Sequence, residues 1–206
     1  MRAIPWILAI VSTIAFAASF SELTRVRKRF GEITQHTFHD HTDVRQAIIR
    51  TSLSQATRPI IIVGDSIAEM APLPIEVSGH EVINAGIGGI TSRELVWISP
   101  RFLEGVTATL IVVSTGANDV GSALNVEEYS KLLRVLKPHA QQLLVMPSTQ
   151  DEAVITNLKK ACVDNAVDIL VVAIPTEGRM PDGVHLNRTG YRIWMQTLAS
   201  YMMRIM

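Results

Sequence analysis

The chain has 206 residues, of which 48% are hydrophobic and 18% charged, and its 19 basic residues balance its 19 acidic ones. This composition excludes a disordered chain and predicts one globular domain with a sizeable core. The zero net charge, without a long basic stripe after residue 30, argues against a nucleic-acid partner. The single cysteine, Cys162, excludes an internal disulfide, and we expect an inert thiol buried in a helix.

Residues 1–20 have the pattern of a signal peptide or a membrane anchor. Arg2 is followed by an uncharged apolar stretch, residues 3–20, in which Ala15-Phe16-Ala17 resembles a small-x-small cleavage site. The same stretch is just long enough to span a bilayer as an uncleaved helix, which would associate the chain with a membrane. We therefore expect an exported protein, periplasmic or secreted, or a membrane-anchored one. The basic residues at 25–29 support an alternative, an anchored domain that faces the cytoplasm.

Residues 21–56 are predicted to form a helical stalk or a lead-in helix. Within this segment His36, His39, Asp40 and Asp43 would share one helix face, where they could bind a divalent metal. A solvated polar face accounts for the same residues, and we favour that interpretation. We therefore predict no metal site and no cofactor.

From residue 57 to residue 206, apolar runs alternate with helical patterns, which predicts an α/β domain. Strands are expected near residues 59–63, 81–84, 108–114, 142–146 and 168–173, and helices near residues 92–104, 125–138, 151–164 and 188–205. The strands are nearly continuous aliphatic runs, which is typical of parallel sheets covered by helices on both faces. The pattern thus predicts a doubly wound fold with a five-stranded parallel sheet.

The first predicted strand stops abruptly in Gly64-Asp65-Ser66. In open parallel sheets, ligands bind at the carboxyl ends of the strands, so Ser66 could be a nucleophile. A structural interpretation accounts for the same residues: Ser66 would be the N-cap of the next helix, and Glu69 would complete a capping box. The ends of the other strands decide between the two interpretations.

Polar groups follow the other strands as well. The second strand ends in the glycine-rich sequence NAGIGGITS, residues 84–92, whose backbone N–H groups can approach a ligand closely. Asn118 follows the third strand, and Asp182 and His185 lie three residues apart in a predicted turn near the C-terminus. Together with Ser66, these groups supply what acyl transfer needs: a hydroxyl, an imidazole with an orienting carboxylate, and donors for a developing oxyanion.

Four blocks of the chain resemble, in order and context, the signature blocks of the SGNH/GDSL hydrolase family: Gly64-Asp65-Ser66-Ile67, Gly86, Asn118 in Gly-Ala-Asn-Asp, and Asp182-Gly183-Val184-His185. The resemblance covers roughly residues 58–200 and implies a flavodoxin-like three-layer α/β/α sandwich. It implies that Ser66 is the nucleophile, His185 the general base and Asp182 its orienting acid. The oxyanion hole would combine the N–H groups of Ser66 and Gly86 with the side-chain amide of Asn118.

The resemblance further implies a serine hydrolase that cleaves carboxylic esters of small-molecule, glycan or lipid substrates through an acyl-enzyme on Ser66. Among these we favour short acyl or O-acetyl groups. Two alternatives stay open: a glycan O-acetyltransferase that uses the same acyl-enzyme, and a catalytically silent binding module. Asp65 and Asp119 each adjoin a site residue, and we interpret both as acceptors that fix the loop backbone, not as the triad acid.

Overall fold

The computed structural model of the chain describes residues 4–34 and 41–205, with side chains described at residues 12–27 and 41–205. The chain divides into two compact units, and the division falls between Asp40 and His41. The second unit contains every residue singled out as a candidate for catalysis.

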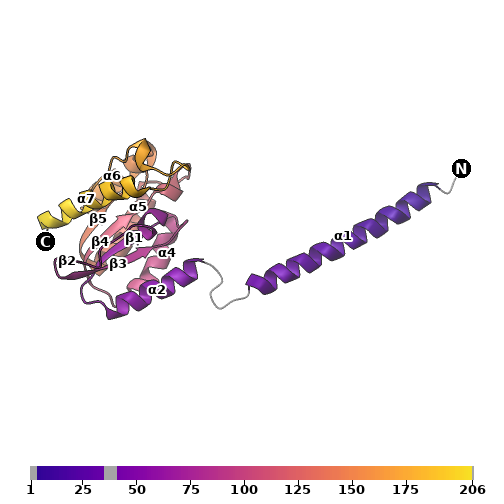
Figure 1. Ribbon diagram of the computed structural model, residues 1–206, viewed down its shortest axis with the longest axis horizontal. Coiled ribbons are helices and arrows are strands. Elements are labelled where there is room, and N and C mark those ends of the chain that lie inside the picture. The colour runs from indigo at the N-terminus through magenta and orange to yellow at the C-terminus, as the bar shows by residue number, and fades with distance from the viewer. Residues whose placement is uncertain (1–3, 35–40, 206) are drawn as a thin grey trace. The chain divides into compact units, whose positions relative to one another are not determined.

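The described residues of the first unit form the helix α1 (Ile4–Thr34), which continues without a break through the predicted boundary at residue 20 (Figure 1). Its described side chains, at residues 12–27, are all exposed. Among the residues that the structure describes, none of the helices combines the length and the apolarity needed to cross a membrane. The assignment of residues 1–20 to a signal peptide or an anchor stays a prediction.

Three of the four residues of the conceivable metal cluster, His36, His39 and Asp40, lie outside the described residues. Within the described part of the chain, no group of three or more His, Cys, Asp or Glu side chains could hold a metal ion.

The second unit begins at α2 (His41–Gln55), which lies in the segment predicted to be a helical stalk or a lead-in helix. The helix is part of the domain core, because Ile49 and Leu53 lie four residues apart on one face and are buried there. The helix packs against strand β3 (His80–Gly86) and helix α4 (Ser92–Leu103). The compact domain therefore starts at His41 and not at residue 57.

Six strands form the sheet, in the order β2-β3-β1-β4-β5-β6. Besides β3, they are β1 (Ile60–Gly64), β2 (Glu76–Val77), β4 (Ala108–Ser114), β5 (Ala140–Val145) and β6 (Asp168–Ile169). All neighbours pair in parallel except β2, which is antiparallel to β3.

The five parallel strands confirm the predicted doubly wound sheet, and their order, with β1 between β3 and β4, is the flavodoxin-like one. The expected total of five strands was one too few. The edge strand β2 was missed because two residues are too short for a periodic pattern to show. The last strand is also shorter than the predicted 168–173, since only Asp168 and Ile169 pair with β5.

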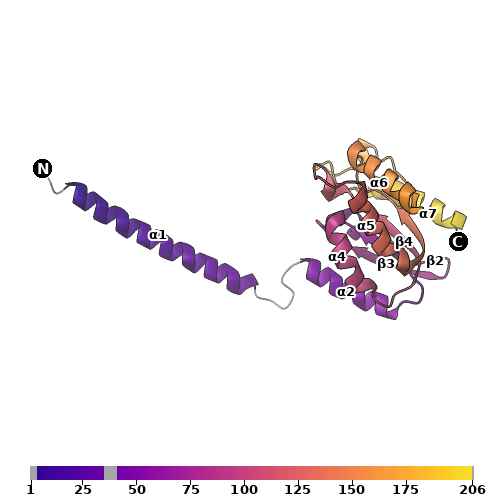
Figure 2. The same cartoon turned by 180° about the vertical axis from the view of Figure 1, so that it is seen from behind.

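Helices cover both faces of the sheet, as Figures 1 and 2 show from opposite sides. One face carries α3 (Ser66–Glu69) and α7 (Arg188–Ile205), and the other carries α2, α4, α5 (Val126–Leu136) and α6 (Glu152–Asn165). The fold is therefore the predicted three-layer α/β/α sandwich. Cys162 of α6 is buried, as expected.

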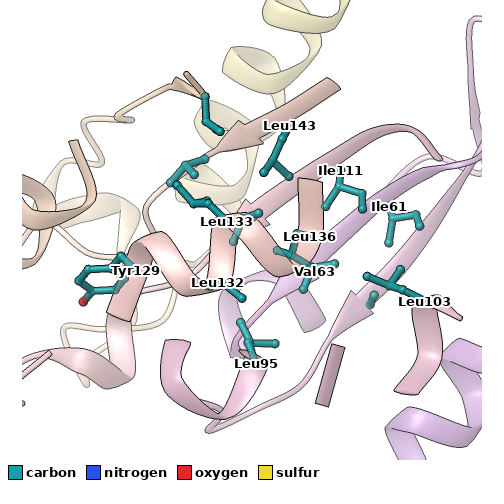
Figure 3. Packing of buried hydrophobic residues seen from close by; sticks show 14 of the residues in the cluster. Ile61, Val63, Leu95, Leu103, Ile111, Tyr129, Leu132, Leu133, Leu136 and Leu143 are labelled. Atoms are coloured by element: carbon teal, nitrogen blue, oxygen red, sulfur yellow. The ribbon is translucent and has the colours of Figure 1, made fainter. Parts of the chain in front are cut away.

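The strands are continuous aliphatic runs because their side chains contribute to two separate hydrophobic cores, one on each face of the sheet. Ile61 and Val63 of β1 belong to the same buried cluster as Leu133 and Leu136 of α5, and Figure 3 shows Val63 next to Leu136. Ile60 and Ile62 point to the opposite face, toward the core that contains Trp194 of α7. Because successive side chains of a strand point to opposite faces, burial on both sides requires an apolar residue at every position.

Candidate active site

Ser66 lies where the chain leaves β1 and begins the short helix α3. The N-cap of this helix is Asp65, whose Oδ1 accepts a 3.0 Å hydrogen bond from the N–H of Ile67. The alternative in which Ser66 is the N-cap and Glu69 completes its capping box is therefore wrong. Since Asp65 does the capping, the hydroxyl of Ser66 is left for other contacts at the carboxyl end of the sheet.

The hydroxyl of Ser66 meets His185, which in turn meets Asp182. His185 Nε2 lies 3.0 Å from Ser66 Oγ, and His185 Nδ1 lies 2.7 Å from Asp182 Oδ2. The other carboxylate oxygen, Oδ1, accepts the N–H groups of Val184 and His185 at 2.9 Å each. The structure thus brings together all three residues of the sequence-predicted triad, from two segments far apart in the chain.

The local hydrogen bonds determine the protonation of this chain of contacts. The bond from His185, together with the two backbone N–H groups, lowers the pKa of Asp182 to about 2. An ionised carboxylate only accepts hydrogen bonds, so His185 Nδ1 carries the proton in its neutral form. Its Nε2 is then an acceptor, positioned to take the proton of Ser66.

The family resemblance assigned the N–H of Gly86 to the oxyanion hole, but this N–H is already hydrogen-bonded within the protein. This N–H donates a 3.0 Å hydrogen bond to Asn84 Oδ1. A Cβ at Gly86 would lie only 2.2 Å from the backbone nitrogen of Glu69. The geometry therefore corrects the assignment: Gly86 is a glycine because β3 passes very close to α3, and its N–H is not free to bind an oxyanion.

Gly89, three residues further on, has the free N–H that Gly86 lacks. Its φ of +78° is in the region that favours glycine, and open space surrounds the position where a Cβ would be. Among the described residues, no acceptor is hydrogen-bonded to the N–H of Gly89 or to that of Ser66. The glycine-rich sequence signalled this segment but could not show which of its glycines keeps an unpaired donor.

Asn118 connects the third predicted block to the same segment. It lies in a 3-10 turn, Ala117–Asp119, that follows β4. Its Nδ2 donates a 2.9 Å hydrogen bond to the carbonyl of Ile90, the residue after Gly89. Because a side-chain amide carries two N–H groups, one donor of Asn118 remains for a ligand.

The two aspartates that adjoin site residues fix the loop backbones, as interpreted from the sequence. Asp65 is fully buried, and its Oδ2 accepts bonds from Ser148 Oγ at 2.5 Å and from the N–H of Ala117 at 3.3 Å. Burial raises the pKa of Asp65 to about 6, although these hydrogen bonds oppose the shift. Its position beside Ser66 thus serves to hold the turn after β4 against the turn after β1.

Asp119 is the second of these aspartates and holds the start of α4. It accepts hydrogen bonds from the N–H and the hydroxyl of Ser92 and from the hydroxyl of Tyr129. Burial, together with the charge and the hydrogen bond of Asp119, raises the pKa of Tyr129 well above its usual range. Neither Asp119 nor Asp65 is bonded to His185, so Asp182 is the carboxylate that orients the imidazole.

Comparison with known proteins supports the fold at low sequence identity. No protein-family model matches the sequence, and no curated protein matches it either. A GDSL-like lipase from Bacteroides thetaiotaomicron matches in structure with a TM-score of 0.62 and 15% identity, over 81% of this chain and 100% of that one. A psychrotrophic esterase from a Pseudoalteromonas species matches with a TM-score of 0.59 and 16% identity, over 72% of this chain and 98% of that one.

An acetylxylan esterase from Geobacillus stearothermophilus, solved as a catalytic mutant, matches with a TM-score of 0.55 and 15% identity, over 69% of this chain and 93% of that one. The chain therefore has the fold of the SGNH/GDSL hydrolases. Within that fold, its carboxyl-edge loops carry a Ser-His-Asp arrangement beside two unpaired backbone N–H groups and a side-chain amide.

Proposed function

We propose that this protein is a serine hydrolase that cleaves carboxylic esters through an acyl-enzyme on Ser66. The observation that carries the proposal is the continuous chain of contacts Ser66–His185–Asp182, with distances of 3.0 and 2.7 Å. A neutral imidazole between a hydroxyl and an ionised carboxylate is the arrangement that activates a serine for attack on a carbonyl. The fold shared with lipases and esterases supports the same chemistry.

In the first half of the reaction, Ser66 Oγ attacks the carbonyl carbon of the ester while His185 Nε2 takes its proton. The carbonyl oxygen becomes an oxyanion, which the N–H groups of Ser66 and Gly89 and the free amide N–H of Asn118 would stabilise. His185 then donates its proton to the departing alcohol, which leaves an ester between Ser66 and the acyl group.

In the second half, His185 takes a proton from water, and the resulting hydroxide attacks the acyl-enzyme. The tetrahedral intermediate collapses, the carboxylic acid leaves, and the proton returns from His185 to Ser66 Oγ. Asp182 stays ionised throughout and stabilises the imidazolium that forms in each half.

Short acyl or O-acetyl groups are the substrates that we favour. The site lies open at the surface of the domain, since the side chains of Asp182 and His185 are 47% and 32% exposed. An acyl group on a large alcohol, such as a glycan, can reach an open site without being enclosed, whereas a long acyl chain would need an apolar cover. The acetylxylan esterase among the structural neighbours acts on an acetylated glycan of this type.

The test is hydrolysis of p-nitrophenyl esters from acetate to a long acyl chain by the full chain and its Ser66→Ala variant. We expect turnover that disappears in the variant and is fastest with the shortest chain. Turnover that survives Ser66→Ala would contradict the acyl-enzyme. An optimum at long chains would contradict the preference for short acyl groups. A folded wild-type chain without any turnover would contradict hydrolysis and favour the transferase or the binding module. An assay for acetyl transfer to a glycan acceptor separates these two alternatives, because only the transferase forms the acetylated glycan.

A further inference from the structure

We infer that Glu69, held in place by Arg45 of α2, is a positioning residue for the segment that would supply an oxyanion donor. This segment, residues 87–90, is called the glycine loop below. The inference rests on the proposed ester hydrolysis and extends it to two residues that lie outside the triad and outside the donors themselves.

Glu69 contacts the glycine loop directly. Its Oε2 accepts a hydrogen bond of 2.5 Å from the N–H of Gly88, the residue before Gly89. A Cβ at Gly88 would lie 3.0 Å from the same oxygen, so the close approach depends on the absence of a side chain there. Glu69 is the last residue of α3, the helix that begins with Ser66, so one short element carries both the nucleophile and the support of the loop.

Two basic side chains of α2 enclose the carboxylate of Glu69. Arg45 Nε lies 3.3 Å from Glu69 Oε1, and His41 Nε2 lies 2.8 Å from Glu69 Oε2. The side chains of Glu69 and Arg45 are only 18% and 15% exposed. Removing two charges from water to this degree costs desolvation energy, which offsets much of their attraction. The pair is therefore expected to contribute little to the stability of the fold.

Arg45 also binds the end of the strand from which the glycine loop departs. Its guanidinium donates to the carbonyl of Gly86 at 2.9 Å and to the carbonyl and side-chain oxygen of Asn84 at 3.2 and 3.3 Å. Arg45 therefore fixes Glu69 relative to the start of the loop. The planar guanidinium can make these contacts at once, which an ammonium group could not reproduce.

The N–H of Gly89 lies between two fixed points of the backbone. On one side, Glu69 holds the N–H of Gly88, and on the other, Asn118 holds the carbonyl of Ile90. Donors stabilise an oxyanion best when their direction is set before the reaction, because no energy is then spent on reorganisation. Loss of the Glu69 support should therefore reduce the rate of the chemical step more than it reduces substrate binding.

The experiment uses the full chain with Glu69→Ala, Glu69→Gln and, as a matched control, Arg134→Gln. Arg134 pairs with Glu127 on the surface of α5, outside the glycine loop and its supports. We expect Glu69→Ala to lower kcat for p-nitrophenyl acetate about 10- to 100-fold with little change in KM, which is less than the loss of a whole donor. Glu69→Gln keeps an acceptor oxygen for Gly88 and should recover much of this rate. The control should behave as the wild type.

A second readout does not depend on activity. In the wild type, the amide proton of Gly88 should exchange slowly with solvent, and Glu69→Ala should accelerate its exchange and shift the amide resonances of Gly88 and Gly89. If Glu69→Ala fails to fold, the same measurements on Glu69→Gln and Arg45→Lys replace it.

The outcomes separate the two proposals. A folded Glu69→Ala variant with wild-type kcat, or with unchanged Gly88 exchange, would overturn the positioning role and leave ester hydrolysis intact. A lower unfolding temperature with an unchanged kcat would show that the pair is only structural. A wild type without turnover would refute the proposed hydrolysis, and the exchange data would still decide whether Glu69 holds the loop.

Discussion

The side-chain amide of Asn118 donates a 2.9 Å hydrogen bond to the backbone carbonyl of Ile90. This contact joins the turn after β4 to the loop after β3, two strands that β1 separates in the sheet. It places the third sequence block next to Gly89. In the proposed mechanism, Asn118 would both hold the loop and offer its second N–H to an oxyanion.

Replacement of Asn118 by alanine should lower kcat about 100- to 1,000-fold, because it removes one donor and frees the carbonyl of Ile90. The steady-state kinetics of p-nitrophenyl acetate hydrolysis measure this loss. Asn157→Ala is the matched control, since Asn157 makes a comparable 3.2 Å bond to the carbonyl of Leu124 away from the site. A similar loss of kcat in both variants would contradict the assigned role.

Alanine at Gly86 and alanine at Gly89 should have different effects on stability. A Cβ at Gly86 would meet the Glu69 backbone nitrogen at 2.2 Å, so we expect a loss of about 3 kcal/mol or more in the free energy of unfolding. At Gly89 the Cβ has room, and only the positive φ is unfavourable, at a cost of about 1–2 kcal/mol. Urea unfolding of both variants measures the difference. Equal losses would show that the approach of β3 to α3 relaxes easily.

The buried carboxyl of Asp65 should make the stability of the domain depend on pH. Its pKa is raised from 3.8 to about 6 in the folded state, so the folded protein binds the proton more tightly than the unfolded chain. Between about pH 4 and pH 6 the folded state then carries more protons, and the free energy of unfolding falls as the pH rises. Across this pH range, the titration of Asp65 should lower the free energy of unfolding by a total on the order of 3 kcal/mol.

Comparison with Asp65→Asn isolates this contribution from the other titrating groups. The difference in unfolding free energy, wild type minus variant, should be larger at pH 4 than at pH 7, because asparagine does not titrate. Asp164→Asn, at an exposed position of α6, should show no such trend. If the wild type and Asp65→Asn curves run parallel from pH 4 to pH 7, the raised pKa of Asp65 is refuted.

Truncation at the two candidate domain boundaries should give opposite results. A chain that begins at His41 keeps the whole core and should unfold cooperatively, whereas one that begins at residue 57 lacks Ile49, Leu53 and Arg45. Each buried aliphatic side chain contributes about 2–5 kcal/mol, so their joint loss approaches the total stability of a typical domain. Circular dichroism during thermal unfolding distinguishes the outcomes. A stable, cooperative domain from residue 57 onward would contradict the observed packing of α2.

The architecture of the sheet was predictable from the sequence because its cause is local. β1 and β4 each contain four consecutive aliphatic residues, Ile60 to Val63 and Leu110 to Val113, which predicts strands buried on both faces. Helical patterns between such runs favour parallel strands. The missed strand β2 and the shortened β6 are the elements with the fewest residues, where periodicity carries no signal. The expected domain boundary at residue 57 left out helix α2, whose sequence gives only a weak core signal because just two of its residues are buried.

The contacts among Ser66, His185 and Asp182 also differ in how far apart in the sequence their partners lie. Asp182 and His185 lie in one turn whose backbone N–H groups bind the carboxylate, so their partnership was already indicated by the spacing of the sequence. Ser66 was recognisable from the abrupt end of an apolar strand. These residues were predicted correctly as neighbours because parallel strands bring their carboxyl ends to one edge.

The sequence by itself thus determined the doubly wound sheet and indicated the edge of that sheet at which Ser66, Asp182 and His185 meet. Only the tertiary structure decided that the N–H of Gly86 is occupied, that the N–H of Gly89 has no acceptor among the described residues, and that Glu69 contacts both Arg45 and the N–H of Gly88. The reason is physical: the partner of a backbone N–H is set by contacts between distant segments, whereas strand periodicity and turn geometry are set by neighbouring residues.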